Sequence, residues 1–205
     1  MILIGISGQS GSGKTLTSEM MAKRLNCEVY HLDDLQKEVE IWKRKSFLKR
    51  FTIPYKDSDG EDKVIVNPKL KGKKMSNKAV EDLYEQIKMA ALKSIISKKI
   101  IKQKTSKAEY FIIEGTQLLV YVPMNLLDMR ILIDREYELR QKDVVKRDNI
   151  SEEDFRVREE YDKPKIDLCK SFEYKIENNG TKQELEKQIE VILDKTREKD
   201  DEMIL

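Results

Sequence analysis

The chain has 205 residues, of which 38% are charged and 39% hydrophobic, and its 40 Lys and Arg nearly balance 38 Asp and Glu, leaving a net charge of +2. The apolar share is enough for one core, while 8 Gly, 4 Pro and 2 Cys exclude a collagen and a disulfide-stabilised scaffold. A protein that coats nucleic acid normally has a clear basic surplus, so we expect no nucleic-acid partner.

The apolar N-terminal segment, residues 2–6, runs directly into a glycine-rich stretch and has no basic leader. It therefore predicts a buried strand and no signal peptide. No apolar run approaches the ~18–20 residues that span a bilayer. Cys27 and Cys169 lie far apart without metal-ligand spacing, which is typical of reduced thiols. We expect a cytoplasmic protein with no membrane partner.

Short apolar runs alternate with longer helical patterns, which predicts an α/β fold with a parallel sheet and helices on both faces. Strands are predicted at 2–6, 28–32, 110–113, 130–133 and 172–176, and helices at 15–25, 37–49, 77–100 and 182–195. The long connection after the second strand also predicts a hairpin from 51–53 and 64–66 around Asp59-Gly60. We expect one domain over 1–205 with an insert at 35–108.

Residues 8–15 read GQSGSGKT and fit the phosphate-loop pattern G-x-x-x-x-G-K-[ST] between a strand and a helix. Glycines let the backbone approach phosphate oxygens, and successive N–H groups at the helix N-terminus then point at the anion. The motif predicts a three-layer P-loop NTPase that binds ATP. The predicted nucleotide-binding residues are Gly8, Ser10, Gly11, Ser12, Gly13, Lys14 and Thr15, with Lys14 on the β- and γ-phosphates and Thr15 on Mg²⁺.

A GTPase would also need an N-K-x-D segment, but the only N-K pair, Asn77-Lys78, opens a helix and lacks the acid. Residues 57–60 match D-x-x-G by letter, yet they lie in the predicted hairpin turn. The same stretch fails the EF-hand pattern, because Asp62 and Pro68 stand where glycine and glutamate are required. Among nucleotide-binding proteins, these observations exclude a GTPase and favour a kinase.

Carboxylates follow two of the predicted strands. Asp33 and Asp34 end the second strand and Glu114 ends the third. Ligands of open parallel sheets bind beyond the carboxyl ends of the strands, so we expect Asp33 to orient the attacking hydroxyl, and Asp33 and Glu114 to bind Mg²⁺. Whether Asp33 or Asp34 is the base stays open, and an aspartate here also suits a helix N-cap. His31 is predicted to be a strand residue and not a catalyst.

A basic segment at about 140–160 predicts a lid. Arg140 and Arg147 are seven residues apart and therefore share a helix face. Arginines that close over the site neutralise charge on the transferring phosphoryl group and exclude water. The alternative is a solvated helix with ordinary i,i+4 ion pairs.

These residues resemble the small P-loop kinases of the uridine kinase and dephospho-CoA kinase groups. Ile4–Gly8 with the following loop and Ile112–Gly115 are similar to uridine kinases, whereas Lys146–Glu153 and Lys175–Thr181 look more like dephospho-CoA kinases. Asp143 stands where both groups usually have arginine. The resemblance implies that Asp33 activates the acceptor hydroxyl, that Arg140 and Arg147 belong to the lid helix, and that Asn178 and Gly180 lie near adenine.

The sequence thus predicts an ATP- and Mg²⁺-dependent phosphotransferase acting on a hydroxyl of a small metabolite bound by the 35–108 insert. The main prediction for this acceptor is a nucleoside, as in uridine kinases, and the alternative is dephospho-CoA. An alternative of another class is a catalytically inactive ATP-binding regulatory protein. A nucleic-acid end kinase would need a basic channel, which the charge balance does not favour. The oligomeric state and the extent of lid motion stay open.

Overall fold

The computed structural model describes residues 1–35, 52–56, 62–66 and 77–204. The chain forms two compact units, one made of Met1–Asp33 and Lys99–Leu205 and the other of Asp34–Lys98. The predicted helix at 37–49 and the turn pair Asp59-Gly60 lie outside the described residues.

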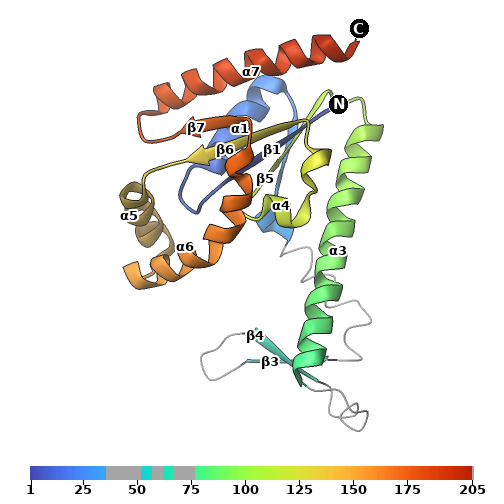
Figure 1. Cartoon of the computed structure of the whole chain (residues 1–205), viewed down its shortest axis with the longest axis vertical. Coiled ribbons are helices and arrows are strands. Elements are labelled where there is room, and N and C mark those ends of the chain that lie inside the picture. Colours follow the sequence, from blue (N-terminus) through green and yellow to red (C-terminus); the bar gives the residue numbers. More distant parts are fainter. Residues whose placement is uncertain (36–51, 57–61, 67–76, 205) are drawn as a thin grey trace. The chain divides into compact units, whose positions relative to one another are not determined.

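A parallel five-stranded sheet forms the centre of the first unit (Figure 1). Its strands, in spatial order, are β2 (Glu28–His31), β5 (Tyr110–Glu114), β1 (Ile2–Gly8), β6 (Met129–Asp134) and β7 (Tyr174–Glu177). All neighbouring pairs are parallel, which confirms the predicted sheet. Because β5 and β6 flank β1 on opposite sides, the strand order reverses at β1, and its carboxyl end is where such folds bind ligands.

The strand register brings the predicted functional segments together at that end of the sheet. Glu114 on β5 lies opposite Ile6 of β1 and His31 of β2, so the carboxylate is next to both strand ends. Gly8, the first residue of the phosphate loop, pairs with Ile133 near the end of β6. Every residue of β1 is buried, as expected for a central strand covered on both faces.

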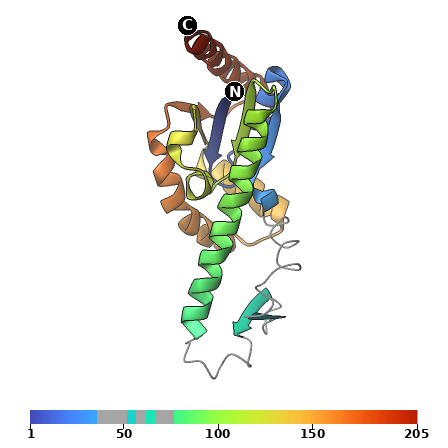
Figure 2. The same cartoon turned by 90° about the vertical axis from the view of Figure 1, so that its right-hand side faces the viewer.

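Helices cover both faces of the sheet (Figures 1 and 2), as the fold class predicts. Helices α1 (Lys14–Leu25) and α7 (Lys182–Ile204) pack on one face, where Met21 and Ile189 join strand residues such as Ile4 in the core. Helices α4 (Leu118–Tyr121) and α6 (Glu152–Asp167) lie on the other side. Helix α5 (Tyr137–Asp148) connects β6 to α6.

Most element boundaries agree with the sequence analysis to within a few residues, but three differ. The fifth strand was expected at 172–176, whereas β7 begins at Tyr174, because Phe172 follows a 3₁₀ segment (Leu168–Ser171) and buries its ring outside the strand ladder. Helix α3 (Asn77–Thr105) and helix α7 both extend beyond the predicted ends.

The second unit contains the predicted hairpin. Strands β3 (Thr52–Lys56) and β4 (Asp62–Val66) pair antiparallel, with Thr52 opposite Val66. The hairpin predicted from the short apolar segments at 51–53 and 64–66 is therefore confirmed for the described residues. Helix α3 begins in this unit and its last turns belong to the first.

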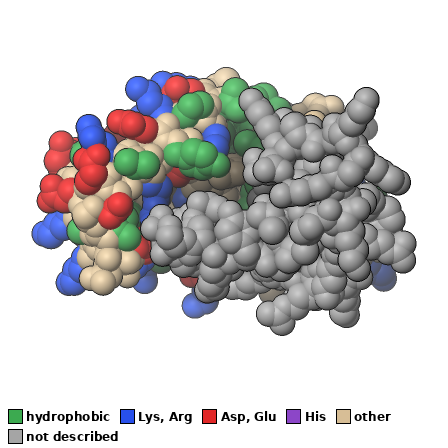
Figure 3. All heavy atoms as spheres, turned by 90° about the horizontal axis from the view of Figure 1, so that it is seen from below, with side chains coloured by type: hydrophobic (Ala, Val, Ile, Leu, Met, Phe, Trp, Pro, Cys, Tyr) green, Lys and Arg blue, Asp and Glu red, His purple; other side chains and the backbone are tan. Residues whose placement is uncertain are grey.

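The surface of the described residues is strongly charged but mixed in sign. On the face drawn in Figure 3, Lys and Arg side chains are interspersed with Asp and Glu, with apolar side chains between them. Within the described ranges, no helix is both long and apolar enough to cross a bilayer.

Candidate active site

The phosphate loop connects β1 to α1 and depends on glycine at two positions. Gly11 has φ 77° and Gly13 has φ 95°, a left-handed conformation that residues with a Cβ rarely adopt. A Cβ on Gly13 would lie 2.2 Å from Nδ2 of Asn178, and one on Gly11 would lie 2.7 Å from Cγ2 of Val144. The glycines thus give both the backbone turn and the space for neighbouring elements to approach.

The N-terminus of α1 is open toward the loop. Its N-cap, Gly13, has no side chain to accept a hydrogen bond, and the first turn contains no acidic residue. The first N–H groups of a helix have no partner within the helix and favour anions. The hydroxyl of Ser12 is buried and has no hydrogen-bond partner within the described part of the chain. Together these donors form a site that suits phosphate oxygens.

Lys14 is half-buried and has carboxylates in its surroundings. Its Nζ donates a hydrogen bond to the carbonyl of Gln9 at 3.2 Å. Burial lowers the pKa of Lys14 below its ordinary value, and the carboxylates of Glu114 and Asp33 partly oppose this shift. A polyphosphate beside the ammonium group would replace the solvation that burial removes.

Glu114, Thr15 and His31 form a polar cluster at the ends of β5, α1 and β2. Oε1 of Glu114 accepts a hydrogen bond from Thr15 Oγ1 at 3.2 Å and lies 2.7 Å from Nδ1 of His31. Oε2 of Glu114 is buried and has no partner among the described residues. A buried carboxylate oxygen without a donor, next to a threonine hydroxyl, fits a hard cation such as Mg²⁺.

Few protein ligands surround this position. Within the described ranges, no cluster of three or more His, Cys, Asp or Glu residues has an arrangement that could hold a metal ion.

Asp33 is exposed in a short 3₁₀ segment, Leu32–Asp34, directly after β2. Its charge raises the pKa of Lys14 against the larger effect of burial. A hydrogen bond from Arg147 to Asp148 raises the pKa of Arg147, and Asp33 adds to that shift. The structure therefore brings Asp33 into the electrostatic surroundings of the phosphate-loop lysine and of one lid arginine.

The two arginines predicted to belong to a lid both lie on helix α5 but have different surroundings. Arg140 is only 3% exposed, and its guanidinium forms an ion pair with Glu159 at 2.6 Å. Its Nε also donates to the carbonyl of Arg135 at 2.9 Å. The side chain of Arg147 is 61% exposed and pairs with the adjacent Asp148 at 2.7 Å. Arg140 is thus fixed next to the loop, whereas Arg147 is accessible.

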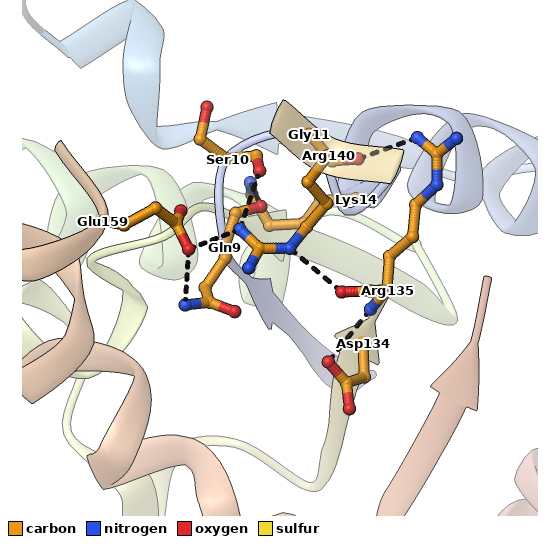
Figure 4. A network of polar contacts seen from close by, with 8 residues as sticks. All are labelled: Gln9, Ser10, Gly11, Lys14, Asp134, Arg135, Arg140 and Glu159. Atoms are coloured by element: carbon orange, nitrogen blue, oxygen red, sulfur yellow. Dashed lines mark hydrogen bonds and ion pairs between the residues drawn. The ribbon is translucent and has the colours of Figure 1, made fainter. Parts of the chain in front are cut away.

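Glu159 connects α6 to the phosphate loop. Gln9 in the loop donates a hydrogen bond from Nε2 to Oε2 of Glu159 at 3.0 Å, and the same oxygen accepts from Arg140 (Figure 4). Sequence reasoning assigned no role to Gln9 or Glu159, since nothing in the spacing of α6 indicates which acid turns inward. His31 was assigned only a strand position, although it lies in register with Glu114.

The predicted adenine-site residues lie between β7 and α7. Asn178 donates from Nδ2 to the carbonyl of Ser12 at 2.8 Å, so its amide contacts the phosphate loop. Gly180 lines a surface depression with neighbouring residues of β7 and α7 (Lys175, Glu177, Asn179, Glu184 and Gln188). A Cβ on Gly180 would lie 2.1 Å from Oε2 of Glu184.

Comparison with known proteins identifies a family for this chain. The family model described as dephospho-CoA kinase matches residues 2–184. The chain belongs to the dephospho-CoA kinase family. As a member of it, the chain is an ATP-dependent phosphotransferase with a hydroxyl group as acceptor, as the sequence predicted.

Individual relatives agree with the family match. A dephospho-CoA kinase of Bacillus cereus (strain ATCC 10987 / NRS 248) is 25% identical over 200 residues, covering 94% of this chain and 96% of the relative. One of Chlorobaculum tepidum is 26% identical over 204 residues, covering 93% of each chain. Of the two acceptor predictions, these findings favour dephospho-CoA over a nucleoside.

Solved structures confirm the fold. TT1252 from Thermus thermophilus superposes with a TM-score of 0.63 at 19% identity, covering 95% of this chain and 97% of that one. A dephospho-CoA kinase from Campylobacter jejuni has a TM-score of 0.54 at 16% identity, covering 95% and 96% of the two chains.

Proposed function

We propose that this protein transfers the γ-phosphoryl group of ATP to a hydroxyl of dephospho-CoA. The family match over residues 2–184 is the observation that carries the proposal. The segments Lys146–Glu153 and Lys175–Thr181, which resemble dephospho-CoA kinases, support it from the sequence. Uridine, the main acceptor prediction of the sequence analysis, becomes the alternative.

The phosphate loop would hold the triphosphate. Backbone N–H groups of residues 8–13, the hydroxyls of Ser10 and Ser12 and the uncapped N-terminus of α1 would donate to the phosphate oxygens. Lys14 would contact the β- and γ-phosphates with its half-buried ammonium group. No catalytic proton transfer is required of these groups, because phosphoryl transfer depends mainly on positioning and charge stabilisation.

Mg²⁺ is proposed to bind beside Thr15 and Glu114, with Asp33 of the 3₁₀ segment after β2 as a further ligand. The unpartnered Oε2 of Glu114 supports this placement. When bound, Mg²⁺ would offset the negative charge of the phosphate oxygens. His31 would hold the other oxygen of Glu114 in place through the 2.7 Å contact.

Asp33 is proposed to orient the acceptor hydroxyl and to accept its proton. Its exposed carboxylate leaves room for an acceptor, and Lys14 and Arg147 keep positive charge nearby. Arg147, accessible on α5, is the arginine best placed to reach the transferring group. Arg140 is a second candidate, with its charge buried beside the loop.

Three further assignments remain proposals. Residues 140–160, which include most of α5 and part of α6, would act as a lid over the nucleotide. The insert at 35–108 would bind the acceptor. Asn178 and Gly180 would lie near the adenine base.

A coupled assay of ADP release with dephospho-CoA as acceptor tests this function. We expect wild-type turnover, and a loss of at least about 100-fold in Lys14→Ala, because the lysine stabilises charge that develops in transfer. Lys23→Ala, an exposed lysine on the same helix, is the matched control and should match the wild type. Full activity of Lys14→Ala, or no turnover of dephospho-CoA by the wild type, would contradict the proposal.

A further inference from the structure

Side chains donate hydrogen bonds to four successive carbonyl groups of the phosphate loop, and three of these side chains come from outside the loop. Four successive carbonyls each accept a side-chain hydrogen bond: Gln9 from Lys14 at 3.2 Å, Ser10 from Arg140 at 3.4 Å, Gly11 from Arg135 at 3.1 Å, and Ser12 from Asn178 at 2.8 Å. The contact to Ser10 is long, whereas those to Gly11 and Ser12 have ordinary hydrogen-bond lengths. Three of the four donors lie after β6 in the sequence, far from the loop.

These bonds fix the direction in which the loop presents its N–H groups. A peptide unit is planar, so its carbonyl and the N–H of the next residue point in opposite directions. Binding the carbonyl of Ser12 from outside therefore turns the N–H group of Gly13 toward the interior of the loop. The N–H group of Ser12, which follows the bound carbonyl of Gly11, donates to the carbonyl of Gln9 at 3.1 Å and closes the turn. A phosphate binds there through successive N–H groups.

The loop glycines permit this approach from outside. The space that a Cβ on Gly13 would occupy is filled by the amide of Asn178. The space beside Gly11 is filled by helix α5, where the backbone of Arg140 would lie 3.2 Å from a Cβ. Glycine at these positions therefore admits the supporting residues as well as the positive φ angles.

The supporting arginines are themselves fixed by acids on the lid helices. Arg135 pairs with Asp143 of α5 at 2.7 Å, and Arg140 pairs with Glu159 of α6 at 2.6 Å. Figure 4 shows Arg135 and Arg140 converging on the loop from the end of β6 and from α5. Asp143, the residue that departs from the arginine usual in related kinases, thus orients the arginine that holds Gly11.

We propose that Asn178 and Arg135 are positioning residues that hold the phosphate loop in its anion-binding conformation, with Arg140 in support. The inference rests on the proposed function of the loop in binding the phosphates of ATP. It assigns the side-chain amide of Asn178 to the loop, a role separate from the position near adenine proposed for Asn178 and Gly180.

Isothermal titration with tripolyphosphate and with ATP, each with Mg²⁺, separates the two roles. Loss of one hydrogen bond that orients the loop should weaken both ligands equally, by about fivefold to tenfold in Asn178→Ala. The matched control is Gln183→Ala, which removes an exposed amide in the first turn of α7, outside the surface depression that Gly180 lines. This control should bind both ligands like the wild type.

A second pair of variants keeps the test independent of the folding of Asn178→Ala. Arg135→Ala should also weaken tripolyphosphate and ATP by the same factor, whereas Arg130→Ala, which removes a surface ion pair from the same strand, should not. Circular dichroism melting of each variant without ligand measures its stability. It therefore shows whether a loss of affinity exceeds what a loss of stability would explain.

Other outcomes would overturn the inference in distinguishable ways. If Asn178→Ala weakens ATP but not tripolyphosphate, the amide contacts the base. If Asn178→Ala and Arg135→Ala bind like their controls, neither positions the loop, while the proposed function stands. If the wild type binds neither ligand, the proposed role of the loop fails and the inference fails with it.

Discussion

Asp33 is the residue on which the proposed chemistry most depends. It is exposed after β2, and its charge affects both Lys14 and Arg147. Asp33→Asn keeps the shape but removes the proton acceptor, so we expect kcat to fall by about 10²–10⁴-fold with little change in ATP affinity. Steady-state kinetics and ATP titration measure the two effects.

Asp34→Asn is the matched control, because sequence reasoning left open which aspartate acts as base. Turnover of Asp33→Asn within tenfold of the wild type, or a larger loss in Asp34→Asn, would contradict the assignment to Asp33.

The thiol of Cys27 gives a prediction about pH. Burial, followed by the nearby carboxylate of Glu28, raises its pKa from 9.0 to about 11. At pH 8.5 the native thiol should therefore react with iodoacetamide at least about tenfold more slowly than in urea, since only the thiolate is reactive. The same shift means that stability is lost as pH rises between 9.0 and about 11, because the unfolded thiol ionises first. Equal rates in native and unfolded protein would contradict the shift.

Among individual residues, the sequence indicated those whose roles follow from a local pattern. Lys14 and Thr15 belong to a contiguous motif, and Glu114 follows an apolar strand. Arg135 and Glu159 were missed because their roles depend on contacts with the loop carbonyl of Gly11 and the side chain of Gln9, which lie far away in the chain. No local spacing encodes such contacts.

At the scale of elements, α6 begins with a complete capping box. The Ser151 hydroxyl accepts from the Asp154 N–H at 3.0 Å, and the Asp154 carboxylate accepts from the Ser151 N–H at 3.1 Å. Ser151→Ala should lower the free energy of unfolding by about 1 kcal/mol. Urea denaturation measures this change. The control Ser171→Ala removes an exposed serine outside the α-helices and should have no comparable effect; equal effects would show that the box does not stabilise α6.

Element existence was predictable because the hydrophobic periods are clear, as in α7 with Leu185, Ile189, Ile192 and Leu193 on one face. The residues at which elements begin and end were less predictable from the sequence. Phe172 looked like a strand residue because a buried aromatic ring has the same sequence signal whether it lies in a strand or in the connection before one.

At the scale of the whole molecule, nucleotide binding should couple to folding. A ligand that binds only the native state stabilises it by about 2.7 kcal/mol at 100 times its Kd. We therefore expect the Tm to rise with ATP and Mg²⁺ in the wild type and to stay unchanged in Lys14→Ala. Differential scanning fluorimetry measures both. A similar rise in Lys14→Ala would show that ATP binds elsewhere.

The fold class followed from alternation of strands and helices, but the strand order did not. No local sequence pattern predicts that β5 lies between β2 and β1 in the sheet. This strand order brings Glu114 beside Thr15 and His31. The local motifs also could not predict the identity of the acceptor, because every member of the wider kinase group has the phosphate loop. The evidence for dephospho-CoA as the acceptor is the family match over residues 2–184.

The most direct measurement of the central claim is a comparison of kcat/KM for dephospho-CoA and uridine, with ATP and Mg²⁺ saturating. We predict that dephospho-CoA is converted to CoA with a kcat/KM at least about 100-fold above that for uridine. Preferential phosphorylation of uridine, or ATP binding without transfer to either acceptor, would contradict the proposed function.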